Sequence, residues 1–152
     1  MRLVNICRKS ILVLMKIKRN ATARWEGTGK EGEGFLSTQS GVLKDQRYGF
    51  QSRFADGPGT NPEELVGAAH AGCFSMKLAF NLQAEGITAD KIETTSTVVL
   101  EEGAIREVIL ETTVSAKGLD EGKFQELAAD AKQNCPISKL LNAEIVFKAT
   151  LV

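Results

Sequence analysis

The sequence predicts a single α+β domain, and three observations support that fold class. Its 152 residues fit one domain of ordinary size and are too few for two substantial cores. Segments with the two-residue period of strands alternate irregularly with segments of helical period, in the order βββαββααβ. No βαβ unit is repeated and no glycine-rich phosphate-binding motif occurs, so a doubly wound nucleotide-binding fold is disfavoured.

The chain begins with a stretch that does not fit the domain. Residues 1–14 are basic and aliphatic without a clear period, and Met15 directly precedes the first strand-like alternation. We therefore expect an N-terminal extension at residues 1–14, one domain at residues 15–152, and Met15 as a candidate initiator.

Three strands are expected next. Residues 16–25 and 34–40 alternate as strands do and flank a glycine-rich turn, so they predict a hairpin. A third strand is predicted over Tyr48–Phe54, where aromatic and polar residues alternate. The glycines and the proline of residues 55–61 end it.

A long helix is the clearest predicted element. Asn61 is a good N-cap, Pro62 suits the first helical position, and Glu63 and Glu64 place negative charge where the helix dipole favours it. Gly86 is the expected C-terminal glycine. The middle is apolar nearly all round, which predicts enclosure by the fold or by a partner subunit. Small residues there would let another backbone approach closely: Gly67, Ala68, Ala69, Ala71 and Gly72.

The remainder predicts a second hairpin, two helices and a last strand. β-Branched residues alternate in the hairpin strands, and apolar residues recur at helical spacing after the N-cap Asp120. The expected bounds are 92–100 and 105–116 for the strands, to about 134 and then 136–141 for the helices, and 143–151 for the last strand.

Charge and hydropathy exclude several classes of partner. Lys plus Arg and Asp plus Glu each total 19, so no basic footprint for nucleic acid exists. Seven bases precede the first acid, Glu26, which leaves the rest of the chain acidic and indifferent to anionic membranes. No apolar run approaches the roughly 20 residues of a spanning helix, and residues 11–15 are too short for a secretory signal. We expect a cytoplasmic protein.

The three cysteines, Cys7, Cys73 and Cys135, are too few and too scattered for a disulfide framework. Cys73, in the middle of the long helix, is either a small buried hydrophobe or a reactive thiol. The helix dipole is too distant to stabilise its thiolate, so a reactive Cys73 needs a nearby cation. Lys77, one turn later on the same face, and Arg53, just ahead of the helix, are the two candidates.

Cys135 has a more suggestive setting, because it precedes Pro136 at the expected N-cap of a short helix. Such a position lowers a thiol pKa, although a merely convenient small cap is the competing interpretation. His70 shares a helix face with Cys73 and is either a base for it or a hydrogen-bonded core residue, which is the commoner case. One histidine and no acidic cluster at ligand spacing predict no metal site.

Two cysteine-containing motifs connect the sequence to a known family. Residues 53–76 (RFADGPGTNPEELVGAAHAGCFSM) and 134–141 (NCPISKLL) closely resemble the OsmC branch of the OsmC/Ohr peroxiredoxin-like family. The resemblance extends over nearly everything from Met15 onward, including residues 37–43 (STQSGVL). The first 14 residues are the only clear departure from the family pattern.

The resemblance implies an intertwined homodimer, with antiparallel sheets around a long central helix and two active sites at the subunit interface. It implies a stress-response peroxidase that reduces organic hydroperoxides, and hydrogen peroxide less readily, without a cofactor or metal. Carried over by motif, Cys73 is the peroxidatic cysteine and Cys135 the resolving one. Arg53 stabilises the thiolate and Glu63 holds that arginine.

The chemistry of these residues agrees with the implied roles. Peroxide cleavage needs a thiolate, a donor to the departing alkoxide and a route back from sulfenic acid, and an arginine with two thiols supplies all three. An external dithiol must then reduce the Cys73–Cys135 disulfide, and lipoyl-type, thioredoxin-like and small thiols all fit. A non-enzymatic thiol sensor or apolar-ligand binder on the same fold is the alternative function.

Helix geometry adds a hypothesis about the arginine. Glu63 and Cys73 lie ten residues apart on one predicted helix, which separates their backbones by roughly 15 Å along the axis. One arginine side chain cannot reach both. We therefore expect that the Arg53 and Glu63 that serve a given Cys73 come from the partner subunit.

Overall fold

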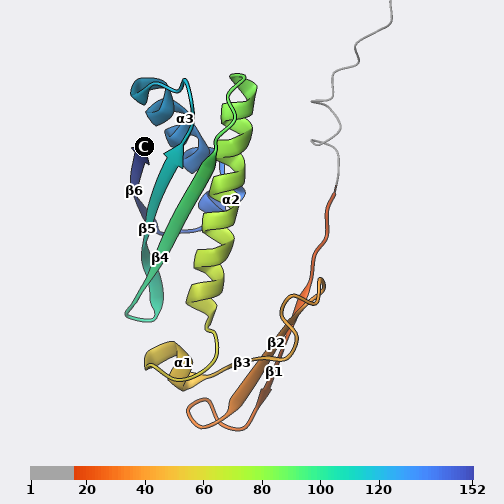
Figure 1. The fold of residues 1–152 in the computed structure, drawn as a ribbon. Helices are drawn as coiled ribbons and strands as arrows, with labels where there is room; N and C mark the ends of the chain where they lie inside the picture. Colours follow the sequence, from red (N-terminus) through yellow and green to blue (C-terminus); the bar gives the residue numbers. More distant parts are fainter. Residues whose placement is uncertain (1–15) are drawn as a thin grey trace, which may run out of the picture.

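The structure, a computed structural model, describes residues 16–152, so the extension expected at residues 1–14 and Cys7 within it lie outside the described part (Figure 1). The described chain forms two three-stranded sheets, β1-β2-β3 and β4-β5-β6. The α+β class is confirmed. The elements in chain order are β1 (Ala21–Glu26), β2 (Glu33–Thr38), β3 (Gln46–Tyr48), α1 (Phe50–Phe54), α2 (Pro62–Ala84), β4 (Lys91–Glu101), β5 (Ala104–Ser115), α3 (Glu121–Asn134), α4 (Pro136–Leu140) and β6 (Glu144–Leu151).

The predicted third strand, Tyr48–Phe54, is wrong, and the element order gains a helix there. β3 ends at Tyr48, and the short helix α1 follows. The Ser52 hydroxyl starts this turn, because it accepts from the backbone N–H of Gly49 at 3.0 Å and donates to the carbonyl of Thr60 at 2.8 Å. The aromatic spacing also fits a helix, in which the rings of Phe50 and Phe54 lie 4.9 Å apart one turn from each other.

The expectation that both sheets are antiparallel is also wrong. β4 and β5 form the predicted antiparallel hairpin, whereas β6 pairs parallel to β5, with Glu107 opposite Glu144 and Val114 opposite Leu151. The reason is the connection, because α3 and α4 return the chain to the end of the sheet where β5 began, as every parallel pair requires.

The ends of α2 follow the local signals that predicted them. The Asn61 side chain accepts a hydrogen bond from the backbone N–H of Glu64 at 2.8 Å, which confirms the N-cap. At the other end Gly86 has a φ of 75°. The N–H groups of Gly86 and Ile87 donate back to the carbonyls of Gln83 and Leu82, which is the arrangement of a glycine-terminated helix.

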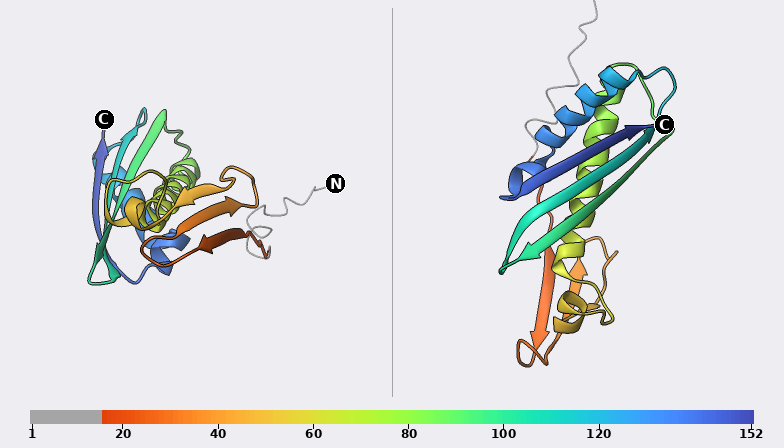
Figure 2. Two further views of the ribbon diagram at one scale, coloured as in Figure 1. Left: turned by 90° about the horizontal axis from the view of Figure 1, so that it is seen from below. Right: turned by 90° about the vertical axis from the view of Figure 1, so that its left-hand side faces the viewer.

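The core lies between the second sheet and the helices that cover one of its faces (Figure 2). One side of α2 contributes the fully buried Phe74, Leu78 and Leu82. α3 adds the four apolar residues that recur at helical spacing: Phe124, Leu127, Ala128 and Ala131. The predicted helix from Asp120 is thereby confirmed, and Asp120 caps it by accepting from the N–H of Lys123 at 3.1 Å. Within residues 16–152, no helix is both long and apolar enough to cross a bilayer.

The opposite side of α2 and the first sheet are not covered by residues 16–152. Met76 and Phe80 on α2 are 63% and 56% exposed. The predicted hairpin of β1 and β2 is present, but every residue of β1 is exposed. Figure 1 shows that sheet projecting away from the core beyond the start of α2. The fold therefore encloses α2 on one side only.

Candidate active site

The structure brings Cys73 and Cys135 together from elements far apart in the chain. Their sulfur atoms lie 2.7 Å apart and share a hydrogen bond, and both thiols are free. A disulfide would need the sulfurs to approach to only about 2.05 Å. The two environments differ, because Cys135 is fully buried whereas Cys73 is partly exposed. A solvent-borne oxidant therefore meets Cys73 first.

The backbone explains how Cys135 reaches this place. Cys135 ends α3 and begins α4, since its N–H donates to the carbonyl of Ala131 at 2.9 Å and its carbonyl accepts from the N–H of Lys139 at 3.1 Å. Pro136 occupies the first position of α4, as predicted, and prevents α3 from continuing straight on. The resulting bend turns the Cys135 sulfur toward the middle of α2.

The pKa of Cys73 is raised in the single chain. Burial is the main cause, and the hydrogen bond shared with Cys135 acts in the same direction. The nearby backbone N–H of Ile137 on α4 has the opposite, smaller effect on this pKa. A thiol with a raised pKa is mostly protonated at neutral pH, so nothing among residues 16–152 of one chain makes Cys73 a thiolate.

Arg53 and Glu63 form a second cluster, apart from the two thiols. The Arg53 guanidinium donates to the Glu63 carboxylate through Nε at 3.1 Å and through Nη2 at 2.7 Å. This pairing with Glu63 raises the pKa of Arg53. Glu63 lies in the first turn of α2, roughly 15 Å along the axis from Cys73. Among the described residues, no hydrogen bond or ion pair joins Arg53 to Cys73.

Lys77, the other candidate cation, has a different partner. Its ammonium lies 3.7 Å from the carboxylate of Asp130 on α3. Asp130 also accepts from the side-chain amide of Asn81 at 2.8 Å, and these donors lower its pKa. Lys77 thus links α2 to α3, and its charge is directed to a carboxylate.

His70 is a core residue with two hydrogen bonds. Its side chain is fully buried, with Nε2 2.9 Å from the Ser138 hydroxyl of α4 and Nδ1 3.3 Å from the Ser96 hydroxyl of β4. Burial lowers the pKa of His70, which keeps the imidazole neutral at pH 7. The structure therefore supports the core interpretation of His70. The role of Ser138 was not visible in the sequence, because it depends on the packing of α4 against α2.

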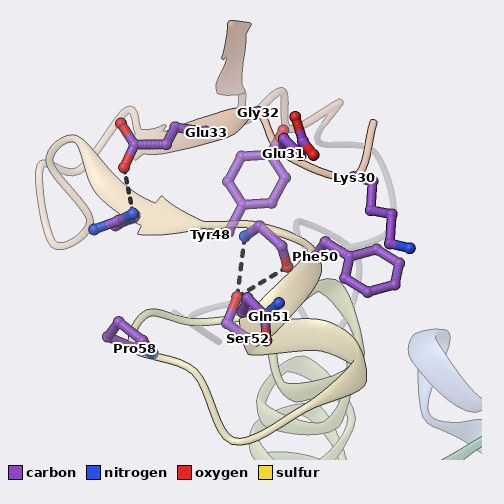
Figure 3. A pocket seen from close by; sticks show the side chains of 11 residues that line it. Lys30, Glu31, Gly32, Glu33, Tyr48, Phe50, Gln51, Ser52 and Pro58 are labelled. Carbon is purple, nitrogen blue, oxygen red and sulfur yellow. Dashed lines mark hydrogen bonds and ion pairs between the residues drawn. The ribbon is translucent and has the colours of Figure 1, made fainter. Parts of the chain in front are cut away.

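A hollow elsewhere in the molecule is less suited to chemistry. It lies between the β2–β3 hairpin and α1 and is lined by Tyr48, Gln51 and Ser52, among others (Figure 3). Part of its polar lining is already paired, since the Ser52 hydroxyl binds backbone groups and Arg47 pairs with Glu33. Over residues 16–152, no group of three or more His, Cys, Asp or Glu side chains is placed to hold a metal ion.

Comparison with known proteins gives consistent matches over most of the chain. Residues 55–150 match the family model described as OsmC-like protein. The chain is 46% identical over 135 residues to peroxiredoxin OsmC of Escherichia coli K12, covering 86% of this chain and 94% of that one. It is 30% identical over 121 residues to the organic hydroperoxide resistance protein OhrB of Bacillus subtilis, covering 78% of this chain and 88% of that one. The crystal structure of OhrB superposes with a TM-score of 0.64 over 90% of this chain and 98% of that one.

Proposed function

This chain belongs to the OsmC-like protein family and is a peroxidase-type enzyme, and on that premise we propose that it reduces organic hydroperoxides to alcohols through Cys73 and Cys135. The observation that carries the proposal is the pair of free thiols with sulfurs 2.7 Å apart, one partly exposed and one buried. This arrangement suits a peroxidatic cysteine that meets the oxidant and a resolving cysteine that waits behind it.

The proposed cycle has two steps at these sulfurs. The Cys73 thiolate attacks the terminal oxygen of the hydroperoxide, the O–O bond breaks, and the alkoxide leaves with a proton as an alcohol. Cys73 is then a sulfenic acid. The Cys135 thiol attacks the Cys73 sulfur, a disulfide forms, and the hydroxyl group leaves with a proton as water. An external dithiol returns both cysteines to thiols.

The surroundings of Cys73 support an organic substrate over hydrogen peroxide. Met76 lies one turn further along α2 and is 63% exposed, so it offers apolar surface about one turn from Cys73. An alkyl chain gains about 25 cal/mol for each Å² of apolar area that it buries. Hydrogen peroxide has no such group and gains nothing there.

We further propose that the enzyme is a homodimer in which each active site uses both chains. An antiparallel pair of α2 helices that cross near Ala68, midway between Glu63 and Cys73, would place the Arg53–Glu63 pair of one chain opposite Cys73 of the other. The residues at that crossing are small and exposed in the single chain: Ala68, Ala69 and Gly72. A cation supplied in this way would lower the pKa of Cys73.

The reductant is proposed to be a dithiol that attacks the Cys73 sulfur of the disulfide. Cys135 is fully buried, so an incoming thiolate cannot reach it in line with the disulfide bond. Lipoyl-type and thioredoxin-like dithiols both fit this requirement. Each cycle ends with two free thiols, which reducing conditions favour, and we therefore place the protein in the cytoplasm.

A turnover assay with cysteine variants tests this function. Purified protein is mixed with tert-butyl hydroperoxide or hydrogen peroxide, and consumption is followed with dihydrolipoamide, a thioredoxin or dithiothreitol as reductant. We expect Cys73→Ser to abolish turnover. Cys135→Ser should reduce one equivalent and then accumulate Cys73 sulfinic acid, which mass spectrometry detects. Cys7→Ser, at the cysteine outside both motifs, is the matched control and should remain fully active.

Two outcomes would contradict the proposal. Multiple turnovers by Cys73→Ser would remove Cys73 from the reaction. Wild-type protein that is oxidised once and then accumulates without turnover under every dithiol would instead be a sensor.

A further inference from the structure

The imidazole of His70 links three elements around the thiol pair. His70 lies on α2 three residues before Cys73, and its two nitrogens contact Ser138 on α4 and Ser96 on β4 at 2.9 and 3.3 Å. A neutral imidazole has one N–H and one bare nitrogen, and a hydroxyl group can donate or accept. Both nitrogens are therefore satisfied in either tautomer, and the link is complete at neutral pH.

Ser138 belongs to the same turn as the groups that contact Cys73. It lies three residues after Cys135, inside the five-residue helix α4. Ile137, directly before Ser138, has its backbone N–H close enough to the Cys73 sulfur to lower the pKa of that thiol. A displacement of Ser138 therefore moves both the resolving sulfur and this backbone donor away from Cys73.

The two sides of Cys135 are held in different ways. On the α3 side, the N–H of Cys135 is bound within the helix by Ala131, and Asn81 of α2 donates to the carbonyl of Leu127 at 3.0 Å. On the α4 side, the hydrogen bond between Ser138 and His70 is the one side-chain hydrogen bond that ties α4 to another element in the described part of the chain. The side-chain hydrogen bonding of α4 to the rest of the fold consequently runs through His70.

We propose that His70 and Ser138 are a positioning pair that holds Cys135 against Cys73 for disulfide formation. The inference rests on the proposed peroxidase function and adds two residues that touch neither the peroxide nor the reacting sulfurs. Such positioning shortens the lifetime of the Cys73 sulfenic acid, because a resolving thiol that is held in place reacts with it sooner.

The sulfenic acid of Cys73 has two fates that compete. Attack by the Cys135 thiol gives the disulfide and releases water. Attack on a second hydroperoxide gives sulfinic acid and releases a second molecule of alcohol, and this product is not recovered by thiols. The first rate depends on how often Cys135 is in place, and the second rises with hydroperoxide concentration. The ratio of disulfide to sulfinic acid therefore measures the position of α4.

The experiment compares Ser138→Ala with Ser96→Ala, which removes the hydroxyl at the other imidazole nitrogen and leaves α4 untouched. Each full-length protein is titrated with tert-butyl hydroperoxide, and the Cys73 peptides are quantified by mass spectrometry. We expect Ser138→Ala to reach half-maximal sulfinic acid at about fivefold lower hydroperoxide, the change that corresponds to losing one neutral hydrogen bond. Ser96→Ala should match the wild type.

A second readout and a rescue variant separate positioning from general loss of structure. Thiolate absorbance against pH should show a lower pKa of Cys73 in Ser138→Ala, because the hydrogen bond from Cys135, which raises that pKa more than the Ile137 backbone lowers it, is lost when α4 moves. Ser138→Thr keeps the hydroxyl and should restore both the titration and the disulfide yield. Equal sulfinic acid formation in Ser138→Ala and the wild type, or an equal increase in Ser96→Ala, would overturn the inference. Wild-type protein that forms no Cys73–Cys135 disulfide would overturn the proposed function as well.

Discussion

At the residue scale, Cys73 and Cys135 differ in burial and in the groups that surround each sulfur. Cys135 is fully buried in the bend between α3 and α4, whereas Cys73 is partly exposed on α2. Exposure decides which sulfur meets a hydroperoxide, and the pKa decides whether that sulfur is reactive. In the single chain the pKa of Cys73 is raised, so the structure leaves the activating cation as the central question for this residue.

The first prediction at this scale concerns that cation. Arg53→Ala is expected to raise the pKa of Cys73 and to slow peroxide reduction at neutral pH. Each added pKa unit lowers the thiolate fraction about tenfold at a pH below the pKa. Because the thiolate is the deprotonated form, the lost rate should return as the pH is raised. Thiolate absorbance and stopped-flow rates against pH measure both effects.

Lys77→Ala provides the matched control for the arginine variant. It removes a cation one turn from Cys73, but that ammonium lies 3.7 Å from the carboxylate of Asp130. We expect little change in the titration of Cys73. If the lysine variant shifts the titration and the arginine variant does not, the activating residue has been assigned to the wrong side chain.

At the scale of the element, α2 has two unlike faces. Gly67 lies against β4, so close that a Cβ added there would lie 2.8 Å from the carbonyl oxygen of Ser96. Gly72 lies on the other face, where an added Cβ would meet nothing within 4 Å in this chain. The first glycine permits close packing inside the subunit. The second is free for contact with another subunit.

Alanine at these two glycines should change the free energy of unfolding in opposite directions. Gly67→Ala should lower the free energy of unfolding by about 1–3 kcal/mol, because α2 must move away from β4. Gly72→Ala should stabilise an isolated chain by up to about 1 kcal/mol through helix propensity. In a dimer whose α2 helices cross near Ala68, one turn from Gly72, the added methyl group should instead weaken association. Denaturant unfolding and sedimentation velocity over a range of concentrations distinguish the two effects. A Gly72→Ala protein that associates as tightly as the wild type would place the dimer contact elsewhere.

At the scale of the whole molecule, the first sheet exposes side chains that nothing in the described chain covers. It has no hydrophobic core of its own, and the Trp25 and Phe54 side chains remain 38% and 55% exposed. Trp25 contacts Tyr48 in the same sheet, with ring centroids 5.5 Å apart. An exposed sheet beside an exposed apolar helix face is the arrangement that a second copy would cover.

A complementation experiment tests the shared site. Cys73→Ser and Glu63→Ala are each expected to be inactive, and mixing them under conditions of subunit exchange should restore activity. Each mixed dimer would contain one site that combines an intact Cys73 with an intact Glu63, so up to about half of the mixed dimer's sites could work. Native mass spectrometry verifies that mixed dimers form. Verified mixed dimers without recovered activity would mean that Glu63 acts within its own chain or not at all.

Much of the fold followed from signals that act over a few residues. The N-cap Asn61, the terminal Gly86 and the helical spacing that begins at Phe124 each predicted their elements, because caps and periodicity depend on neighbours within about one turn. The failure at Tyr48–Phe54 has the same origin. Its aromatic spacing fits both a strand and one helical turn, and the hydrogen bonds of Ser52 to Gly49 and Thr60 favour the helix.

The sequence by itself determined which cysteines are candidates for chemistry, whereas the tertiary structure decided which of the candidate residues meet. Cys73 and Cys135 were identified from their motifs, but 62 residues separate them, and the bend at Pro136 brings their sulfurs to 2.7 Å. The same packing pairs His70 with Ser138 and makes β6 parallel to β5. Such contacts depend on how helices and sheet pack after the chain has folded back, and no local pattern of residues encodes that geometry.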